Sequence, residues 1–177
     1  MTVPRPIRRA VLTAHVTTSV GWVGAVVTFV AIAALGLASE DATTVRGAYL
    51  VMDVAARFVL VPLALLSLAT GVVQSLASSW GLLQHYWVAI KLLITVLATA
   101  VLLLYLRTFA AMADVAADPT AAPGAVRNAS PLVHAVLALV LLTVATVLGV
   151  VKPRRLTRFG RRVAARRPNR SRTPAPG

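Results

Sequence analysis

The chain has 177 residues, of which 58% are hydrophobic and only 13% charged, with no cysteine and a formal net charge of +13. This composition is typical of integral membrane proteins and excludes an ordinary water-soluble domain. The absence of cysteine excludes disulfides, thiolate catalysis and cysteine-ligated metal sites.

The first apolar segment runs from Val11 to Ala38 without a charged residue. About 20 residues suffice to cross a hydrocarbon core roughly 30 Å thick, so this segment can span the membrane with tilt. Arg5, Arg8 and Arg9 precede it, as in a secretory signal. Because the apolar region of a signal has only about 7 to 15 residues, we interpret the segment as a retained span.

Three more apolar segments follow, and each contains ionisable residues. They cover residues 48–77, 86–106 and 131–151. Backbone amides in hydrocarbon must form their hydrogen bonds within the segment, so we predict that all four segments are α-helices. The predicted fold is therefore all-α, a four-helix transmembrane bundle over residues 11–151.

The distribution of lysine and arginine predicts that both termini are cytoplasmic. Residues 1–10 hold three arginines and residues 152–177 hold ten basic residues, together 13 of the 18 in the chain. The positive-inside rule then requires an even number of spans, and four satisfy it. The Ala-, Val- and Arg-rich composition suggests a bacterium, so we expect a multi-pass protein of the bacterial plasma membrane.

The basic tail from 152 to 177 has too little apolar surface to offset its chain entropy, so we predict that it is disordered unless it lies on anionic headgroups. A basic run can bind anionic lipid headgroups or nucleic acid. With a membrane span directly upstream and Phe159 as its one aromatic residue, the tail favours lipid, and we expect no nucleic-acid partner.

Ionisable side chains inside a membrane are costly, so each is a candidate functional residue, with snorkelling to the headgroups as the alternative. With the N-terminus inside, His15 lies roughly 6 Å from the cytoplasmic edge, and Lys91, which enters from the same side, lies at roughly 7 Å. We therefore expect both at one level of the bundle, with His85 and Gln74 near them.

A second group enters from the outer side. Asp53 and Arg57 are four residues apart, so they share a helix face and can form a pair. His134 lies in the first turn of the fourth span, at a depth similar to that of Asp53. We predict an outer polar cluster of these three residues, either as an ion pair that locks the second and fourth spans or as a proton or ion relay.

The chemistry of His15 and Lys91 suits a cofactor site. At 100° per residue, Ser19 and Trp22 fall within about 40° of His15, which gives that helix face a polar character. A neutral imidazole can ligate haem iron or copper, and a lysine can neutralise a haem propionate or transfer protons. The alternative for His15 is a hydrogen bond to a backbone carbonyl of a neighbouring helix.

Two short motifs resemble a superfamily of small bacterial membrane proteins. The sequence HVTTSVGWVGA, with His15 seven residues before Trp22, resembles the first helix of that superfamily, and WVAIKLL, with Lys91 four residues after Trp87, resembles the third. The superfamily includes HemJ-type protoporphyrinogen oxidases, the copper-resistance protein D family and an uncharacterised family of predicted integral membrane proteins, to which the similarity is greatest.

The resemblance extends from about residue 11 to residue 107 and implies roles for two side chains. His15 takes the position of the histidine that HemJ-type proteins use for haem b, and Lys91 takes that of their functionally required lysine. The chain departs from this pattern in its long basic tail. It also lacks the Met- or His-rich external segments that copper import would lead us to expect.

Three functions remain open from the sequence. The first is binding of haem b for electron transfer or tetrapyrrole oxidation, with His15 as axial ligand and Lys91 at a propionate or at the substrate. The second is transport of copper, another small cation or a solute, with Asp53, Arg57 and His134 as outer gate and His15 and Lys91 as inner gate. The third is a cofactor-free membrane scaffold. A redox partner and a homodimer are both compatible with the sequence, and enzymatic activity stays undecided.

Overall fold

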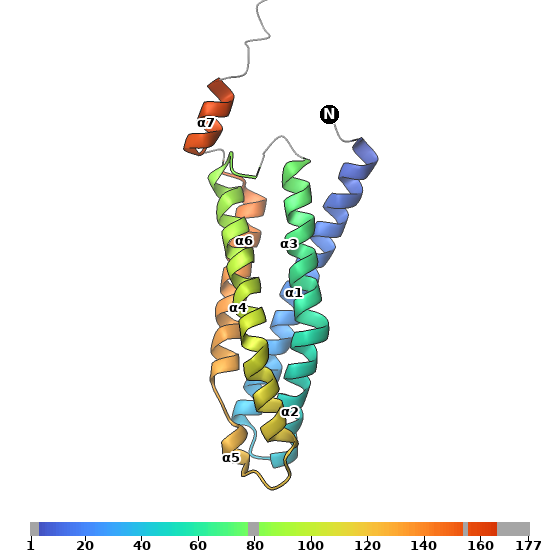
Figure 1. Ribbon diagram of the computed structural model, residues 1–177, viewed down its shortest axis with the longest axis vertical. Helices are drawn as coiled ribbons and strands as arrows, with labels where there is room; N and C mark the ends of the chain where they lie inside the picture. The colour runs from blue at the N-terminus through green and yellow to red at the C-terminus, as the bar shows by residue number, and fades with distance from the viewer. Residues whose placement is uncertain (1–3, 78–81, 154–155, 166–177) are drawn as a thin grey trace, which may run out of the picture.

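The computed structural model describes residues 4–77, 82–153 and 156–165, and within these ranges it contains helices and no strands. Four long helical spans form a bundle in which each span runs antiparallel to the next (Figure 1). Each span is long and apolar enough to cross a membrane. The prediction of an all-α, four-helix transmembrane bundle is thus confirmed.

The second span is continuous but has three parts, and two short helices lie outside the spans. The four spans are α1 (Arg5–Ala38), α2 (Ala42–Ala55) with the π-turn η1 (Ala56–Leu60) and α3 (Val61–Leu76), α4 (Tyr86–Ala117) and α6 (Ser130–Val151). The short helices α5 (Pro123–Val126) and α7 (Arg158–Ala165) lie at opposite ends of the bundle (Figure 1).

Two helices begin earlier than their apolar segments. α1 starts at Arg5 and not at residue 11, because Pro6 lies in its first turn, where the missing N–H of proline costs no hydrogen bond. α2 starts at residue 42 and not at 48, because Asp41 caps it by accepting a hydrogen bond from the Thr44 N–H at 2.8 Å.

α4 continues eleven residues past its predicted end at 106, because its last turns pack against α2. Phe109 and Ala116 in this extension are buried. The guanidinium of Arg46 in α2 donates hydrogen bonds to carbonyls at and beyond the end of α4, those of Ala116, Asp118 and Ala121. These charge-assisted bonds satisfy carbonyls that a helix end otherwise leaves unpaired.

The π-turn η1 precedes Pro62. Proline has no N–H and its ring crowds the carbonyl four residues before it, so the helix must widen or kink there. The N–H of Val61 bonds to the carbonyl of Ala56, five residues back, which is the pattern of a π-turn. Ala56 and Leu60, at the two ends of this turn, both face the core and are buried.

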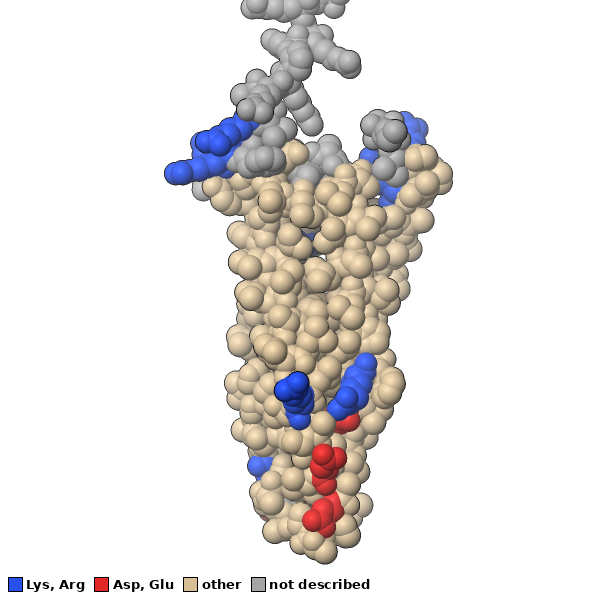
Figure 2. Space-filling model, in the orientation of Figure 1, with Lys and Arg blue, Asp and Glu red and all other residues tan. Residues whose placement is uncertain are grey.

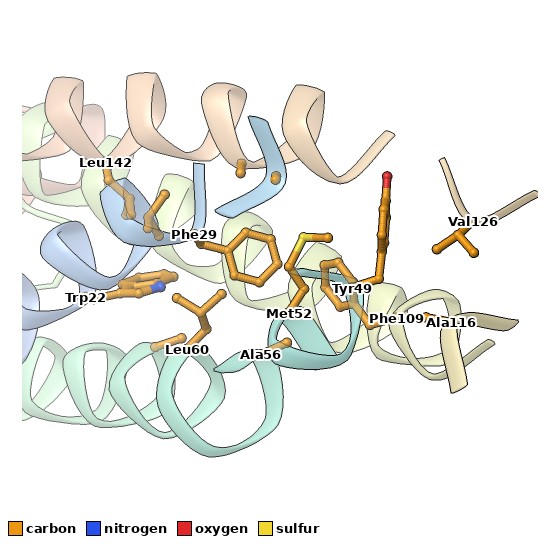
Figure 3. Close-up of a cluster of buried hydrophobic side chains, with 14 of the residues drawn as sticks. Trp22, Phe29, Tyr49, Met52, Ala56, Leu60, Phe109, Ala116, Val126 and Leu142 are labelled. Atoms are coloured by element: carbon orange, nitrogen blue, oxygen red, sulfur yellow. The ribbon is translucent and has the colours of Figure 1, made fainter. Parts of the chain in front are cut away.

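The spans form a ring in the order α1, α2–α3, α4 and α6, so that α1 and α4 face each other diagonally, as do α3 and α6. Large side chains fill the centre. Figure 3 shows Trp22 and Phe29 of α1 together with Met52, Leu60 and Phe109 in this cluster. The rings of Phe29 and Phe109 meet edge to face with centroids 5.3 Å apart, which joins the diagonal helices through their side chains.

The outer surface of the bundle is apolar. Phe58, Leu104 and Val150 expose 74%, 78% and 77% of their surface, an arrangement suited to hydrocarbon and not to water. Charged residues concentrate toward the ends. Figure 2 shows basic residues at the end from which the N-terminus and α7 emerge, and acidic residues in the opposite half.

The fourth span ends at Lys152, whose φ of 46° turns the chain out of the helix. The tail that follows differs in part from the predicted disorder, since residues 158–165 form α7. Thr157 fixes this helix on the connection between α3 and α4, because its N–H donates to the carbonyl of Gln84 at 2.9 Å. Residues 166–177 lie outside the described residues, and for them disorder stays a prediction.

Candidate functional site

A seam of polar side chains joins α1 to α3 in the half of the bundle that holds the start of α1 and the end of α3. His15 Nδ1 lies 3.2 Å from Thr70 Oγ1, and Ser19 Oγ lies 2.8 Å from Ser67 Oγ. Ser67 is buried and His15 is half-buried. The polar face that His15 shares with Ser19 therefore contacts the second span.

The hydrogen bonds of Thr70 determine which ring nitrogen of His15 carries the proton. The Thr70 hydroxyl donates its one hydrogen to the carbonyl of Leu66, at 2.6 Å. Its oxygen can then only accept from His15, so we assign the proton to Nδ1. In the neutral imidazole this leaves a lone pair on Nε2, which is the arrangement of a metal-ligating histidine.

Gly71 determines how closely the imidazole of His15 can approach α3. A Cβ at this position would lie 2.9 Å from Cε1 of His15 and 3.4 Å from Nδ1. Side-chain carbons do not approach other atoms so closely without a shift of one of them. The ring of His15 therefore lies against the backbone of α3, and glycine is the residue that leaves room for it.

Lys91 occupies the corresponding place between α4 and α6. A Cβ at Gly149 would lie 2.7 Å from its Nζ, and the centroid of Trp87 lies 6.0 Å from Nζ, at the limit of a cation–π contact. All five acidic residues of the chain are among the described residues, and none of them pairs with Lys91. Lys91 is thus a half-buried cation without a carboxylate partner, which suits an anionic ligand.

His15 and Lys91 project from diagonal helices and lie in two different interfaces. Both nevertheless lie near the same end of the bundle, because Gly71, which His15 contacts, is five residues from the end of α3 and Lys91 is five residues from the start of α4. The two groups therefore belong to one level of the bundle, although the direct hydrogen-bond partner of His15 comes from the second span and not from the third.

The other two residues of the expected inner group lie toward the end of the bundle. Gln74 lies one turn beyond Thr70, and its Oε1 is buried with no hydrogen-bond partner among the described residues. His85 immediately precedes α4 and forms an isolated antiparallel bridge with Leu156. His85 therefore belongs to the contact between the segment after α6 and the α3–α4 connection.

The expected outer cluster is only partly assembled. Asp53 and Arg57 form the predicted pair, with Oδ1 and Nε 2.9 Å apart, and the side chain of Arg57 is 41% exposed at the bundle surface. His134 lies on α6, which packs against neither α2 nor η1 within the described chain. It stacks instead on Tyr105 of α4, with ring centroids 4.5 Å apart. The pair therefore does not lock the second and fourth spans, and the three residues form no relay.

Three residues of the site were not assigned to it from the sequence: Thr70, Gly71 and Gly149. A signal exists for the first two, because Ser67, Thr70 and Gly71 follow the i, i+3, i+4 spacing of one helix face in an otherwise apolar segment. Gly149 shares a face of small residues with Ala138 and Ala145, which indicates close helix packing. That pattern does not point to Lys91, because the side chain that Gly149 accommodates lies on another helix.

No family model, curated protein or solved structure matches this chain. Over the ranges that the structure describes, there is also no group of three or more His, Cys, Asp or Glu side chains that could hold a metal ion. The site is therefore defined by its own chemistry: an oriented imidazole and a half-buried ammonium group at one level of an apolar bundle.

Proposed function

We propose that this chain is a multi-pass protein of the bacterial plasma membrane that binds haem b and works in electron transfer or tetrapyrrole oxidation. His15 would hold the haem iron through Nε2, and Lys91 would neutralise an anionic group such as a haem propionate. The observation that carries the proposal is the hydrogen bond from His15 Nδ1 to Thr70, because ligating histidines are oriented by such a bond from their other nitrogen. The resemblance of the first and third spans to HemJ-type proteins supports it.

The side chains at this level fit haem better than a metal held by protein alone. A porphyrin supplies four nitrogen ligands, so one or two axial side chains complete the coordination. A copper site without porphyrin needs several protein ligands close together, and the described residues offer no group of three. When bound, haem b supplies a one-electron redox couple.

The residues of the chain have separate tasks in this proposal. Thr70 fixes the tautomer and the ring orientation of His15, and Gly71 lets the ring lie close to α3. Lys91 supplies positive charge at the same level, where the surrounding hydrocarbon makes its attraction for a carboxylate stronger than in water.

The alternatives have less support. Transport through the bundle needs polar groups that face its interior, whereas the Asp53–Arg57 pair has its arginine exposed at the surface. A cofactor-free scaffold gives no role to the half-buried charge of Lys91, which has no carboxylate partner. Both would gain support if the purified protein carried no cofactor.

A dithionite-reduced minus oxidised visible spectrum of the detergent-purified protein tests the proposal. We expect a b-type band in the wild type that is absent in His15→Ala and kept in His134→Ala, a matched histidine control in the opposite half of the bundle. Thr70→Val should weaken haem binding about 10- to 100-fold, as loss of an orienting partner does in other metal sites. A colourless wild type, or a band that persists in His15→Ala, would contradict the proposal.

The orientation that goes with this function places both termini and α7 in the cytoplasm. Arg158, Arg161 and Arg162 of α7 are exposed and bind anionic lipid headgroups. Because the chain has no cysteine, Ser171→Cys and Thr120→Cys can each report the side of the membrane. In spheroplasts, a membrane-impermeant maleimide should label the second variant and not the first. The reverse pattern would overturn the orientation.

A further inference from the structure

A second site lies in the half of the bundle opposite to His15. It is a cavity of about 130 Å³ between α1, α4 and α6. Trp22 and Phe29 of α1 line it, and both belong to the buried cluster of Figure 3. Val101 of α4 and Leu137 of α6 also line it and are 45% and 56% exposed. The cavity therefore opens sideways between α4 and α6, so a ligand enters it from the hydrocarbon and must be lipid-soluble.

The size and walls of the cavity select a single flat ring. An engineered protein cavity of about 150 Å³ binds benzene, whereas sites for larger ligands have about 300 to 1,000 Å³. Among its aliphatic walls the cavity has the rings of Trp22, Phe29, Tyr105 and Phe109. Tyr105 meets Phe109 edge to face at a centroid distance of 5.0 Å and lies beside His134 at 4.5 Å. Such walls favour a planar ring over an acyl chain.

One polar group in this wall has a defined role. His134 Nδ1 lies 2.8 Å from the carbonyl of Ser130, and since a carbonyl can only accept, Nδ1 carries the proton. The neutral imidazole then has a lone pair on Nε2. The nearby hydroxyl of Tyr105 is already bonded to Ser130 Oγ. His134 therefore offers the cavity one acceptor for an O–H donor.

We infer that this cavity binds the ring of a lipid-soluble hydroquinone. One ring hydroxyl donates to Nε2 of His134, the ring lies among Trp22, Phe29 and Tyr105, and the alkyl tail leaves between α4 and α6 into the membrane. A phospholipid acyl chain would fill the same volume but has no hydroxyl for the imidazole. The inference rests on this geometry alone and is independent of haem binding at His15.

Calorimetric titration of the full chain in lipid nanodiscs tests the inference with two probes, of which only one can donate a hydrogen bond. We expect 2-decylhydroquinone to bind saturably and about tenfold more tightly than its dimethyl ether, the effect of one hydrogen bond. The ether has the same ring and tail but cannot donate. Equal affinities, or no saturable binding of the hydroquinone, would overturn the inference.

Two variants locate the binding. His134→Phe keeps a ring beside Tyr105 and removes the acceptor, so the affinity for hydroquinone should fall to that for the ether, which stays unchanged. Ala98→Leu fills the cavity that Ala98 lines and should abolish binding of both probes, whereas Ala100→Leu, on the exposed face of the same helix, should not. Undiminished binding in Ala98→Leu would place the ligand elsewhere and overturn the inference. The comparison of the two probes in the wild type does not depend on whether any variant folds.

Discussion

The imidazole of His15 lies against the backbone of Gly71, so that a Cβ there would fall 2.9 Å from Cε1. Lys91 stands in the same relationship to Gly149, with 2.7 Å to Nζ. In each of the helix pairs α1–α3 and α4–α6, an ionisable side chain of the first helix thus lies on a glycine of the second. The two glycines let charged or ligating groups enter the bundle without separating its helices.

Gly71→Ala should displace the ring of His15 and lower stability. In a helix, alanine is favoured over glycine by about 1 kcal/mol, but overpacking a filled site costs about 1 to 3 kcal/mol, and a rigid ring cannot retreat easily. We expect a lower melting temperature in detergent and weaker haem retention. The matched control is Gly24→Ala, where nothing lies within 4 Å of the new Cβ. Equal behaviour of the two variants would mean that His15 does not lie on Gly71.

Gly149→Ala should move Lys91 without a comparable loss of stability, because the end of a lysine side chain can retreat where a ring cannot. Lys91 and Lys152 are the two lysines of the chain, so mass spectrometry can compare their acetylation directly. We expect the labelling of Lys91 relative to Lys152 to change severalfold in Gly149→Ala. Gly47→Ala, with open space around the new Cβ, is the control and should leave the ratio as in the wild type. An unchanged ratio in Gly149→Ala would count against the contact.

The sequence predicts the spans well because apolar length alone determines which segments can enter a bilayer. It also predicts the Asp53–Arg57 pair, which depends on spacing within one helix. It does not predict which helix meets His15, because rotation of a helix about its axis is set by packing. The π-turn η1 also changes the direction in which α3 side chains point, because it shifts the angular phase of α3 relative to α2. Thr70 and Gly71 therefore cannot be placed by counting from the start of the second span.

The length of α4 shows a second limit of sequence reasoning. Its last turns contain Asp114 and small residues, which do not continue the apolar pattern. The helix nevertheless extends to Ala117, because Arg46 of the preceding span donates to carbonyls at its end. A contact between residues about 70 positions apart thus determines a local boundary that periodicity places at 106.

Arg46→Lys should loosen this end of the bundle. Lysine keeps the charge but lacks the planar fork that reaches several carbonyls at once. We expect the free energy of unfolding to fall by about 1 to 2 kcal/mol. Water that replaces the lost charge-assisted bonds offsets part of their cost. Hydrogen exchange should accelerate in α5 and in the last turn of α4. Arg107→Lys, at an exposed position of α4, is the control, and an equal effect there would show that the fork of Arg46 is dispensable.

Acid should weaken the same end of the bundle through Asp41 and Asp118. The hydroxyl and the N–H of Thr44 donate to Oδ2 of Asp41 at 2.6 and 2.8 Å, and these bonds hold the pKa of Asp41 below its ordinary value of 3.8. Thr120 lowers the pKa of Asp118 in the same way. A carboxyl with a lower pKa in the folded than in the unfolded state contributes its full stability above the unfolded-state pKa. It loses that contribution as the pH falls through the folded-state pKa.

The melting temperature of the wild type should therefore decline as the pH is lowered from about 5 to about 2. In the double variant Asp41→Asn, Asp118→Asn, the amide oxygens can still accept the bonds from Thr44 and Thr120, but they do not titrate. Its melting temperature should be lower than that of the wild type at pH 7, because the carboxylate bonds are the stronger ones, and should change less with acid. If the two curves declined in parallel, the acid sensitivity would not belong to Asp41 and Asp118 at this end.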